Sequence, residues 1–215
     1  MNTPDVDLPL RADARRNRDQ ILVAARAIFA EQGAEVPMEE IARRASVGVG
    51  TLYRRFPDRE ALIRAVFRDS FTAVAEETRA ALAEEPTGWD ALVRIMRLSE
   101  RLRLSMSMHA KSPLVSAVVR ADPVTERLRQ DLLETFDKVV RQAQDEGTLR
   151  RDVGVGDLAM MFVSVVHQAH AVTAEAAGLA PGRVLAIMLD GLRTPAPGDL
   201  PGRPLTRTDL DFDVD

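Results

Sequence analysis

The chain has 215 residues, 46% of them hydrophobic and 4% aromatic, and its many Ala, Leu, Arg and Glu residues favour helices. This composition predicts an all-α protein. The lack of cysteine excludes disulfide bonds and thiolate metal sites. No apolar run reaches the roughly 18 residues of a membrane helix or forms a signal core, so we expect the protein in the cytoplasm. The net charge of −4 argues against a uniformly basic nucleic-acid binder.

The N-terminal part predicts two helices after a polar segment. Residues 1–10 are polar and contain proline, and we expect them to be disordered. Apolar residues at i, i+3, i+4 and i+7 predict an amphipathic helix over residues 13–32, which Gly33 ends. Pro37 suits the start of a second helix over residues 38–45.

Two further helices follow after a short break. Gly48 favours a tight turn, and a short third helix is predicted over residues 49–56. Pro57 ends this helix. Asp58 is placed to cap a long fourth helix over residues 58–84.

The rest of the chain predicts five more helices, which gives about nine in all. They cover residues 89–109, 113–120, 124–146, 157–177 and 182–193. Residues 194–215 hold four Pro and five Asp, and this composition predicts an irregular, mobile tail.

The second and third helices have the layout of a helix-turn-helix, whose second helix enters the major groove of DNA. Leu52 and Phe56 lie four residues apart and are expected to hold the short helix to the first two. Residues 11–64 carry eleven Arg against eight acidic residues, a net charge of +3, whereas residues 65–215 carry −5. The hydroxyl and guanidinium groups opposite Leu52 can donate to phosphate oxygens or to a guanine edge: Thr51, Tyr53, Arg54 and Arg55. The alternative is an ordinary solvated face.

A set of spaced residues runs through the first four predicted helices. It consists of Ala25, Phe29 and Gly33, the pair Ile41-Ala42, the run GVGTLY over residues 48–53, Phe56, and the run DREAL over residues 58–62. Residues 21–67 therefore resemble the DNA-binding domain of the TetR (tetracycline-repressor) family. Residues 127–158 resemble, more loosely, one subgroup of that family's ligand domains.

The resemblance implies an N-terminal three-helix DNA-binding domain over residues 13–60. A long fourth helix would join it to a helical effector-binding and dimerisation domain over residues 61–193, followed by the tail over residues 194–215. Members of the family pair through their last two helices, bind double-stranded DNA at an inverted repeat and respond to a small molecule. We therefore expect a homodimeric repressor released by a mostly apolar effector, although activation also occurs in the family.

The resemblance also implies roles for single residues. Thr51 and Tyr53, and Arg59 where the family usually has Lys, are expected to hold phosphates. Candidates for groove or base contact are Val49, Arg54 and Arg55, with Gly50 allowing close approach of the backbone. Pro37 stands where many members carry Ser or Thr, and it offers DNA neither a hydroxyl nor an N–H, which puts a DNA contact by the second helix in doubt.

Four arginines lie around the start of the first predicted helix, before its first large apolar residue: Arg11, Arg15, Arg16 and Arg18. As a basic arm, they would line phosphates or enter the minor groove, and Arg15 and Arg18 are our candidates. The alternative is a solvated helix start paired with Asp13 and Asp19.

The predicted effector pocket rests on methionine, aromatic and histidine residues of the C-terminal part. Methionine fills irregular cavities, and apolar pockets with few polar groups suit small molecules. The candidates are Trp89, Met96, Met106, His109, Phe136, Met160 and His167. Ordinary core packing is the alternative. The spacing of His167 and His170 alone does not make a metal site, and we expect neither a metal nor a cofactor.

Three other classes of function have to be compared with this expectation. An enzyme would need a convergent catalytic set, but Ser105, Ser107 and His109 point apart on a helix and lack an acidic partner, so we expect no enzymatic activity. A helical protein-interaction module would bind a protein in place of DNA. A DNA-binding regulator without an effector would have a filled pocket.

Overall fold

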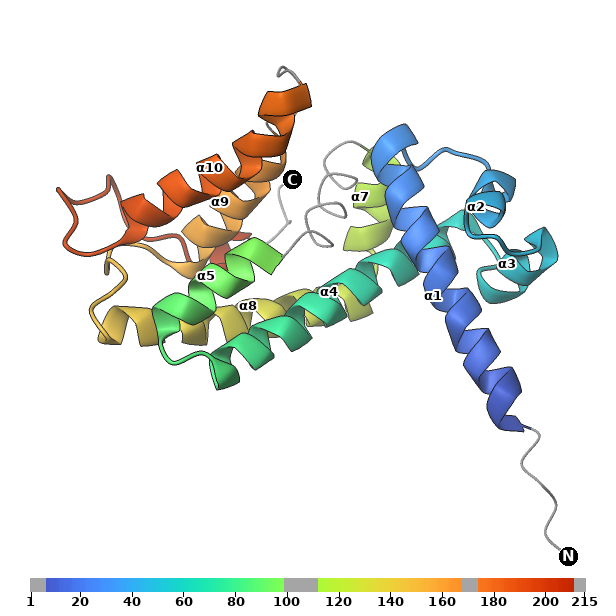
Figure 1. Ribbon diagram of the computed structural model, residues 1–215, viewed down its shortest axis with the longest axis horizontal. Helices are drawn as coiled ribbons and strands as arrows, with labels where there is room; N and C mark the ends of the chain where they lie inside the picture. The colour runs from blue at the N-terminus through green and yellow to red at the C-terminus, as the bar shows by residue number, and fades with distance from the viewer. Residues whose placement is uncertain (1–6, 99–111, 168–173, 211–215) are drawn as a thin grey trace, which may run out of the picture.

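The computed structural model describes residues 7–98, 112–167 and 174–210, which form nine α-helices and one short 3-10 helix (Figure 1). The helices are α1 (Asp7–Gln32), α2 (Met38–Arg44), α3 (Val49–Arg55), α4 (Arg59–Glu84), α5 (Gly88–Leu98), α7 (Pro113–Arg120), α8 (Pro123–Asp145), α9 (Val155–His167), α10 (Ala174–Leu192) and the 3-10 helix η1 (Arg207–Leu210). No β-strand occurs within these ranges, so the all-α prediction is confirmed.

Five helices agree with the sequence to within one residue at each end: α2, α3, α4, α7 and α8. The long helix α1 differs, because it begins at Asp7 and includes residues that we expected to be disordered. Pro9 is compatible with this start, since N–H groups of the first helical turn have no acceptor within the helix. The predicted helix over 89–109 is seen as α5, and its remainder lies outside the described residues.

The predicted ends of the last two helices are wrong. We expected a break between 177 and 182, but α10 begins at Ala174 and passes through Gly178 and Pro181. A proline inside a helix removes one hydrogen bond and costs about 3 kcal/mol. The C-terminal half of α10 offsets this cost by burying Leu189 and Leu192 in the core. Tertiary packing therefore overrides the local Gly and Pro signals.

The helix-turn-helix lies in the head, which we define as residues 7–66, and its turn has an unexpected conformation. Ser46 has a φ of 55°, whereas Gly48 has an ordinary extended backbone with a φ of −66°. The N–H of Ser46 donates to the carbonyl of Arg43 at 3.1 Å, and the N–H of Val47 donates to that of Ala42 at 3.0 Å. This is the pattern that ends a helix through a left-handed residue. The prediction that Gly48 supplies the special backbone of the turn is therefore wrong.

The hydrophobic core of the head continues into the body, which we define as residues 67–193. One cluster of buried residues joins Phe29 of α1 and Leu52 of α3 to Val115 and Val118 of α7 and Leu132 of α8. The head and the adjoining part of the body therefore share one hydrophobic cluster.

A second cluster fills the far end of the body. It joins Trp89 of α5, Phe136 of α8, Leu158 of α9 and Leu189 of α10. Helix α4 contributes to both clusters and lies beside α8 along the long axis of the molecule, with the head at one end and α10 toward the other (Figure 1). A movement of α4 would therefore change the packing of both clusters.

Two adjacent residues of α4, Arg68 and Asp69, form ion pairs with different parts of the chain. Asp69 accepts a hydrogen bond from the buried Arg26 of α1 at 2.6 Å, and Arg26 also donates to Ser70. Arg68 donates twice to Asp122, the N-cap residue of α8, at 2.8 and 2.5 Å. These hydrogen bonds, followed by those from Thr125, hold the pKa of the Asp122 carboxyl well below its usual range. Helix α4 is thus tied to the head and to the body at one point.

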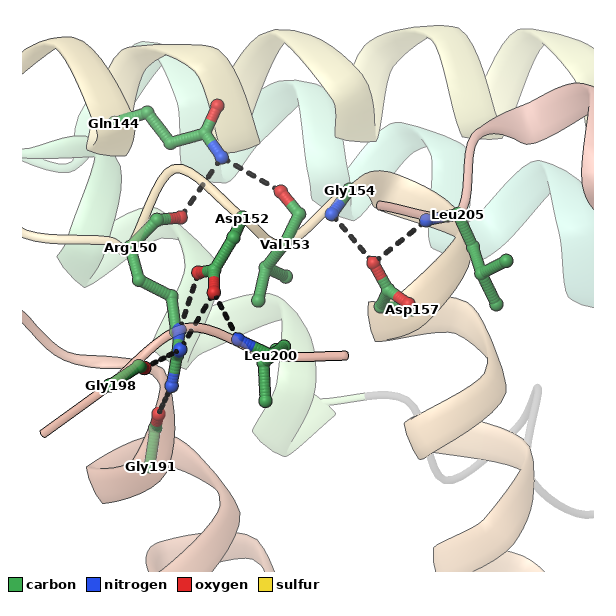
Figure 2. A network of polar contacts seen from close by, with 10 residues as sticks. All are labelled: Gln144, Arg150, Asp152, Val153, Gly154, Asp157, Gly191, Gly198, Leu200 and Leu205. Atoms are coloured by element: carbon green, nitrogen blue, oxygen red, sulfur yellow. Dashed lines mark hydrogen bonds and ion pairs between the residues drawn. The ribbon is translucent and has the colours of Figure 1, made fainter. Parts of the chain in front are cut away.

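The tail over residues 194–210 is held against the body, whereas its composition predicts mobility. Figure 2 shows the contacts: the buried Arg150 pairs with Asp152 at 2.6 Å, and Asp152 accepts the N–H of Leu200 at 2.7 Å. Asp157 accepts the N–H groups of both Gly154 and Leu205. These buried and half-buried polar partners, which composition does not reveal, fix the course of the tail.

Glycines at the start of α9 make room for the tail. A Cβ atom on Gly154 would lie 2.1 Å from the carbonyl oxygen of Leu205, and one on Gly156 would lie 2.6 Å from that of Thr206. Only glycine permits this close approach of two backbones. The tail is therefore built into the fold as far as η1.

Candidate nucleic-acid interface

Helix α3 is anchored on one side and exposed on the other. Leu52 is fully buried and Phe56 is 5% exposed, as their spacing predicts. The opposite side carries the residues that the sequence singled out. Val49, Gly50, Tyr53, Arg54 and Arg55 are exposed and Thr51 is half-buried. These six predicted DNA-contact residues therefore occupy the sides of α3 that Leu52 does not anchor, at the edge of the head (Figure 1).

Several polar groups on this face already have partners. Tyr53 Oη donates a hydrogen bond to Glu39 Oε1 of α2 at 3.3 Å. Arg54 donates to the hydroxyl of Thr51 at 3.4 Å. Both contacts are long and exposed, so incoming phosphate oxygens can compete with them.

The arginines of α2 are paired with acidic residues. Arg44 donates two hydrogen bonds of 2.6 Å to Glu31 of α1, and Arg43 donates to Glu40 on its own helix. These hydrogen bonds lower the pKa of the Glu31 and Glu40 carboxyl groups. The pair of Glu31 and Arg44 could not be predicted from helical spacing, because the two residues are thirteen positions apart and lie on different helices. Both ion pairs reduce the positive charge that α2 presents.

Arg59 does not join the exposed face of α3. Its guanidinium donates to the backbone carbonyls of Ala34 and Val36, in the turn between α1 and α2. The resemblance to the TetR family implied a phosphate contact for Arg59 at the start of α4. In this structure it closes the turn, because a planar guanidinium can satisfy two neighbouring carbonyl groups.

The expected basic arm is part of a helix. Helix α1 includes Arg15 and Arg18, and its N-terminal half projects beyond the rest of the head (Figure 1). Arg15 is exposed, whereas Arg18 forms ion pairs: its Nη1 atom lies 3.6 Å from Oδ1 of Asp19 and 4.0 Å from Oδ1 of Asp69. The side chain of Arg11 is outside the described part. Of the two candidates, Arg15 is the more exposed.

The predicted effector residues are only partly brought together. Trp89, Met96 and Phe136 are buried in one core cluster, and Arg193 stacks 4.3 Å from the centre of the Trp89 ring. Met160 is 48% exposed and lies outside that cluster. Met106 and His109 lie outside the described residues, as does the side chain of His167.

A groove lies elsewhere, between α8 and the tail. Its volume is about 620 Å³, and its lining includes the ion-paired residues Glu134, Asp137, Arg141 and Arg207 together with Lys138. Among the predicted effector residues whose side chains the structure describes, none lines this groove. Its mixed charge does not match the mostly apolar pocket that we expected.

The described residues contain neither a metal-binding cluster nor a membrane-spanning helix. Within the described ranges, no three His, Cys, Asp or Glu side chains are grouped in a way that could hold a metal ion. Among the helices of the same ranges, none has the length and apolar character required to cross a bilayer.

Comparison with family models matches two parts of the chain. Residues 21–66 match the model described as "Bacterial regulatory proteins, tetR family". Residues 101–194 match the model described as "Transcriptional regulator SbtR-like, C-terminal domain". The first match covers the helix-turn-helix, and the second covers most of the body.

Individual proteins give the same result. An HTH-type transcriptional regulator of Staphylococcus aureus (strain MRSA252) is 31% identical over 139 residues, which are 60% of this chain and 72% of that protein. A TetR transcriptional regulator of Streptomyces coelicolor has a crystal structure that is similar with a TM-score of 0.66 and 30% identity, covering 83% of this chain and 99% of that one. The crystal structure of a TetR transcription regulatory protein of Mycobacterium vanbaalenii is similar with a TM-score of 0.62 and 36% sequence identity, covering 86% of this chain and 99% of that one.

Proposed function

Because this chain belongs to the TetR family of bacterial regulatory proteins, we propose that it is a repressor that binds an inverted-repeat operator as a homodimer and is released by a small, mostly apolar effector. At the coarser level, it is a DNA-binding transcriptional regulator and not an enzyme. A regulator of this kind acts where the bacterial chromosome lies, which is the reason to place it in the cytoplasm.

The exposed face of α3 carries the proposal for operator binding. Buried Leu52 fixes the helix, so that Tyr53, Arg54 and Arg55 stand outward on a rigid support. We assign phosphate contacts to Thr51 and Tyr53, because hydroxyl groups position a protein on the DNA backbone. We assign groove contacts to Val49, Arg54 and Arg55, with Gly50 leaving room for the backbone.

The proposed homodimer rests on an apolar surface of the last two helices. Met160 of α9 is 48% exposed, and Leu179 and Ile187 of α10 are 58% and 66% exposed. Large apolar side chains on adjacent helices are typical of a surface that a partner subunit covers. A twofold dimer would place its two α3 helices about one DNA turn apart, roughly 34–36 Å, and this spacing implies an inverted repeat.

The proposed effector response would act through α4. This helix packs against the head at one end and against α5 and α8 at the other. An effector near Trp89, Met96 and Phe136 would have to bind one arrangement of these helices better than another, since only a difference in affinity shifts the equilibrium.

A regulator without an effector is the second candidate. It is favoured by one observation: Trp89, Met96 and Phe136 are each no more than 7% exposed and pack together with other core residues. If this packing is permanent, small apolar molecules will not change the affinity for the operator. Titration of such molecules against the protein–operator complex separates the two candidates.

The first test is selection from a pool of random DNA duplexes at two salt concentrations. We expect the wild type to enrich an inverted repeat, with affinity that falls steeply as salt rises, because phosphate contacts release counterions. The double variant Tyr53→Ala, Arg55→Ala is expected to lose this enrichment. Arg79→Ala removes a charge from an exposed position of α4 and is the matched control, which should select the same site as the wild type.

The opposite result would be equally informative. If no sequence is enriched at either salt concentration and the double variant behaves like the wild type, the face of α3 does not bind DNA. The alternative of a helical protein-interaction module would then take first place.

A further inference from the structure

The hydrogen bond between Tyr53 and Glu39 connects the exposed face of α3 to the first turn of α2. Tyr53 donates its hydroxyl proton to Glu39 Oε1 at 3.3 Å, and the two residues are fourteen positions apart. Glu39 is exposed, and Tyr53 is 41% exposed. The contact is therefore open to any molecule that approaches α3.

Glu39 differs from the other acidic residues around α2. Glu40 is paired with Arg43, and Glu31 is paired with Arg44. No arginine, lysine or histidine within the described ranges forms an ion pair with Glu39. Two positions earlier, Pro37 offers neither an N–H nor a hydroxyl group. The first turn of α2 thus presents, beside Tyr53, a carboxylate that forms no ion pair within the described residues.

The chemistry of the phenol group makes Glu39 and DNA competitors. A tyrosine hydroxyl has one proton to donate, and both a carboxylate and a phosphate can only accept it. If Tyr53 donates to a phosphate oxygen at about 2.7 Å, that oxygen lies no more than about 6 Å from Glu39 Oε1 unless the carboxylate turns away. At this distance two like charges repel each other appreciably, even in water.

We propose that Glu39 is a positioning residue that limits the DNA affinity of the head. In the free protein it holds the hydroxyl of Tyr53, and on DNA it repels the phosphate that takes this hydroxyl over. This inference rests on the proposed function, because it requires Tyr53 to meet phosphate. The repulsion is directed at the DNA backbone, so it weakens binding to the operator and to other duplexes by the same factor and shortens the residence time on both.

The experiment measures the affinity of Glu39→Gln for the selected operator and for a scrambled duplex over a range of salt concentrations. Glutamine keeps the length and an accepting oxygen but removes the charge. We expect both affinities to rise by about threefold to tenfold for each half-site. We also expect the slope of log affinity against log salt to become steeper, by up to about 0.9 for each half-site. A purely structural role of Glu39 would leave this slope unchanged.

Two comparisons make the result specific. Glu76→Gln makes the same change at an exposed position of α4, outside the head, and should leave affinity and slope as in the wild type. In a Tyr53→Phe background, which lacks the hydroxyl, the gain from Glu39→Gln should become smaller, because the competition for the proton is gone. The thermal unfolding of each variant shows that the fold is retained.

The possible outcomes separate this inference from the proposed function. If the wild type binds no duplex, the proposed function fails and the role of Glu39 fails with it. If the wild type binds the operator but Glu39→Gln has unchanged affinity, or gains no more than Glu76→Gln, only the role of Glu39 is overturned. A gain of the same size in the Tyr53→Phe background would overturn the part assigned to the hydroxyl.

Discussion

At the scale of single residues, Ser46 shows how a local conformation can depart from its sequence signal. Two glycines follow it, yet Ser46 has the left-handed backbone that ends α2. A side chain in that region costs about 1–2 kcal/mol relative to ordinary backbone. The hydrogen bonds of the turn and the burial of Leu52 just after it hold Ser46 there.

We therefore expect Ser46→Gly to stabilise the protein. Glycine adopts this backbone without strain, and part of the gain is lost because glycine also loosens the unfolded chain. The free energy of unfolding should rise by about 0.5–1 kcal/mol, measured by urea denaturation. Ser46→Ala retains a Cβ atom and should give no gain, so equal stabilisation by both variants would show that strain at this position is absent.

The same scale shows which site residues a sequence can reveal. The spacing of Leu52 and Phe56 predicts the buried side of α3 and therefore also the exposed side with Tyr53 and Arg54. The partners Glu39 of Tyr53 and Ala34 of Arg59 could not be predicted. They depend on how separate helices meet in space, which periodicity within one helix does not encode.

At the scale of elements, helix boundaries follow the sequence where capping residues are strong. Ser112, Asp122 and Asp58 each cap the helix that was predicted after them. The predicted helix boundary was wrong at α10, where Gly178 and Pro181 favour a break. The helix continues past them and buries Leu189 and Leu192 in its last turns. The prediction also failed for the tail, whose partners Arg150 and Asp152 lie in another part of the chain.

The docking of the tail gives a prediction at this scale. In Gly154→Ala, the new methyl group would overlap the carbonyl oxygen of Leu205, so the tail must move away and its hydrogen bond to Asp157 is lost. We expect a loss of about 1–3 kcal/mol in the free energy of unfolding. Faster cleavage by trypsin after Arg207 would report the released tail.

Gly182→Ala is the matched control for this change. A Cβ atom on Gly182 meets no atom within 4 Å, and alanine favours a helix such as α10. This variant should be as stable as the wild type or more so, with no change in cleavage after Arg207. If Gly154→Ala behaves in the same way, the tail is not held by this contact.

At the scale of the whole molecule, the exposed apolar side chains of α9 and α10 should determine the oligomeric state. Ile187→Asp places a charge in the middle of the proposed dimer surface, and burying a carboxylate there is strongly unfavourable. We expect the variant to sediment as a monomer at concentrations at which the wild type is a dimer. Operator affinity should fall with it, since the two half-sites are no longer bound together.

A control on the head tests whether the effect is local. Val23 of α1 is 58% exposed, close to the value for Ile187, and Val23→Asp introduces the same charge far from α10. This variant should remain a dimer. If both variants are monomers, or if neither is, the last two helices do not form the subunit interface. Circular dichroism of each variant verifies that the helices are intact.

The hydrophobic cluster that joins the head to α7 has a consequence for how such proteins can diversify. If the head were exchanged with that of a relative at residue 60, the cluster that contains Phe29, Leu52, Val115 and Val118 would be assembled from residues of two different proteins. The mismatch would leave voids or clashes where close packing now exists. We therefore expect a transplanted head to need compatible residues in α7, which is distant in the sequence, if this shared cluster is to stay closely packed.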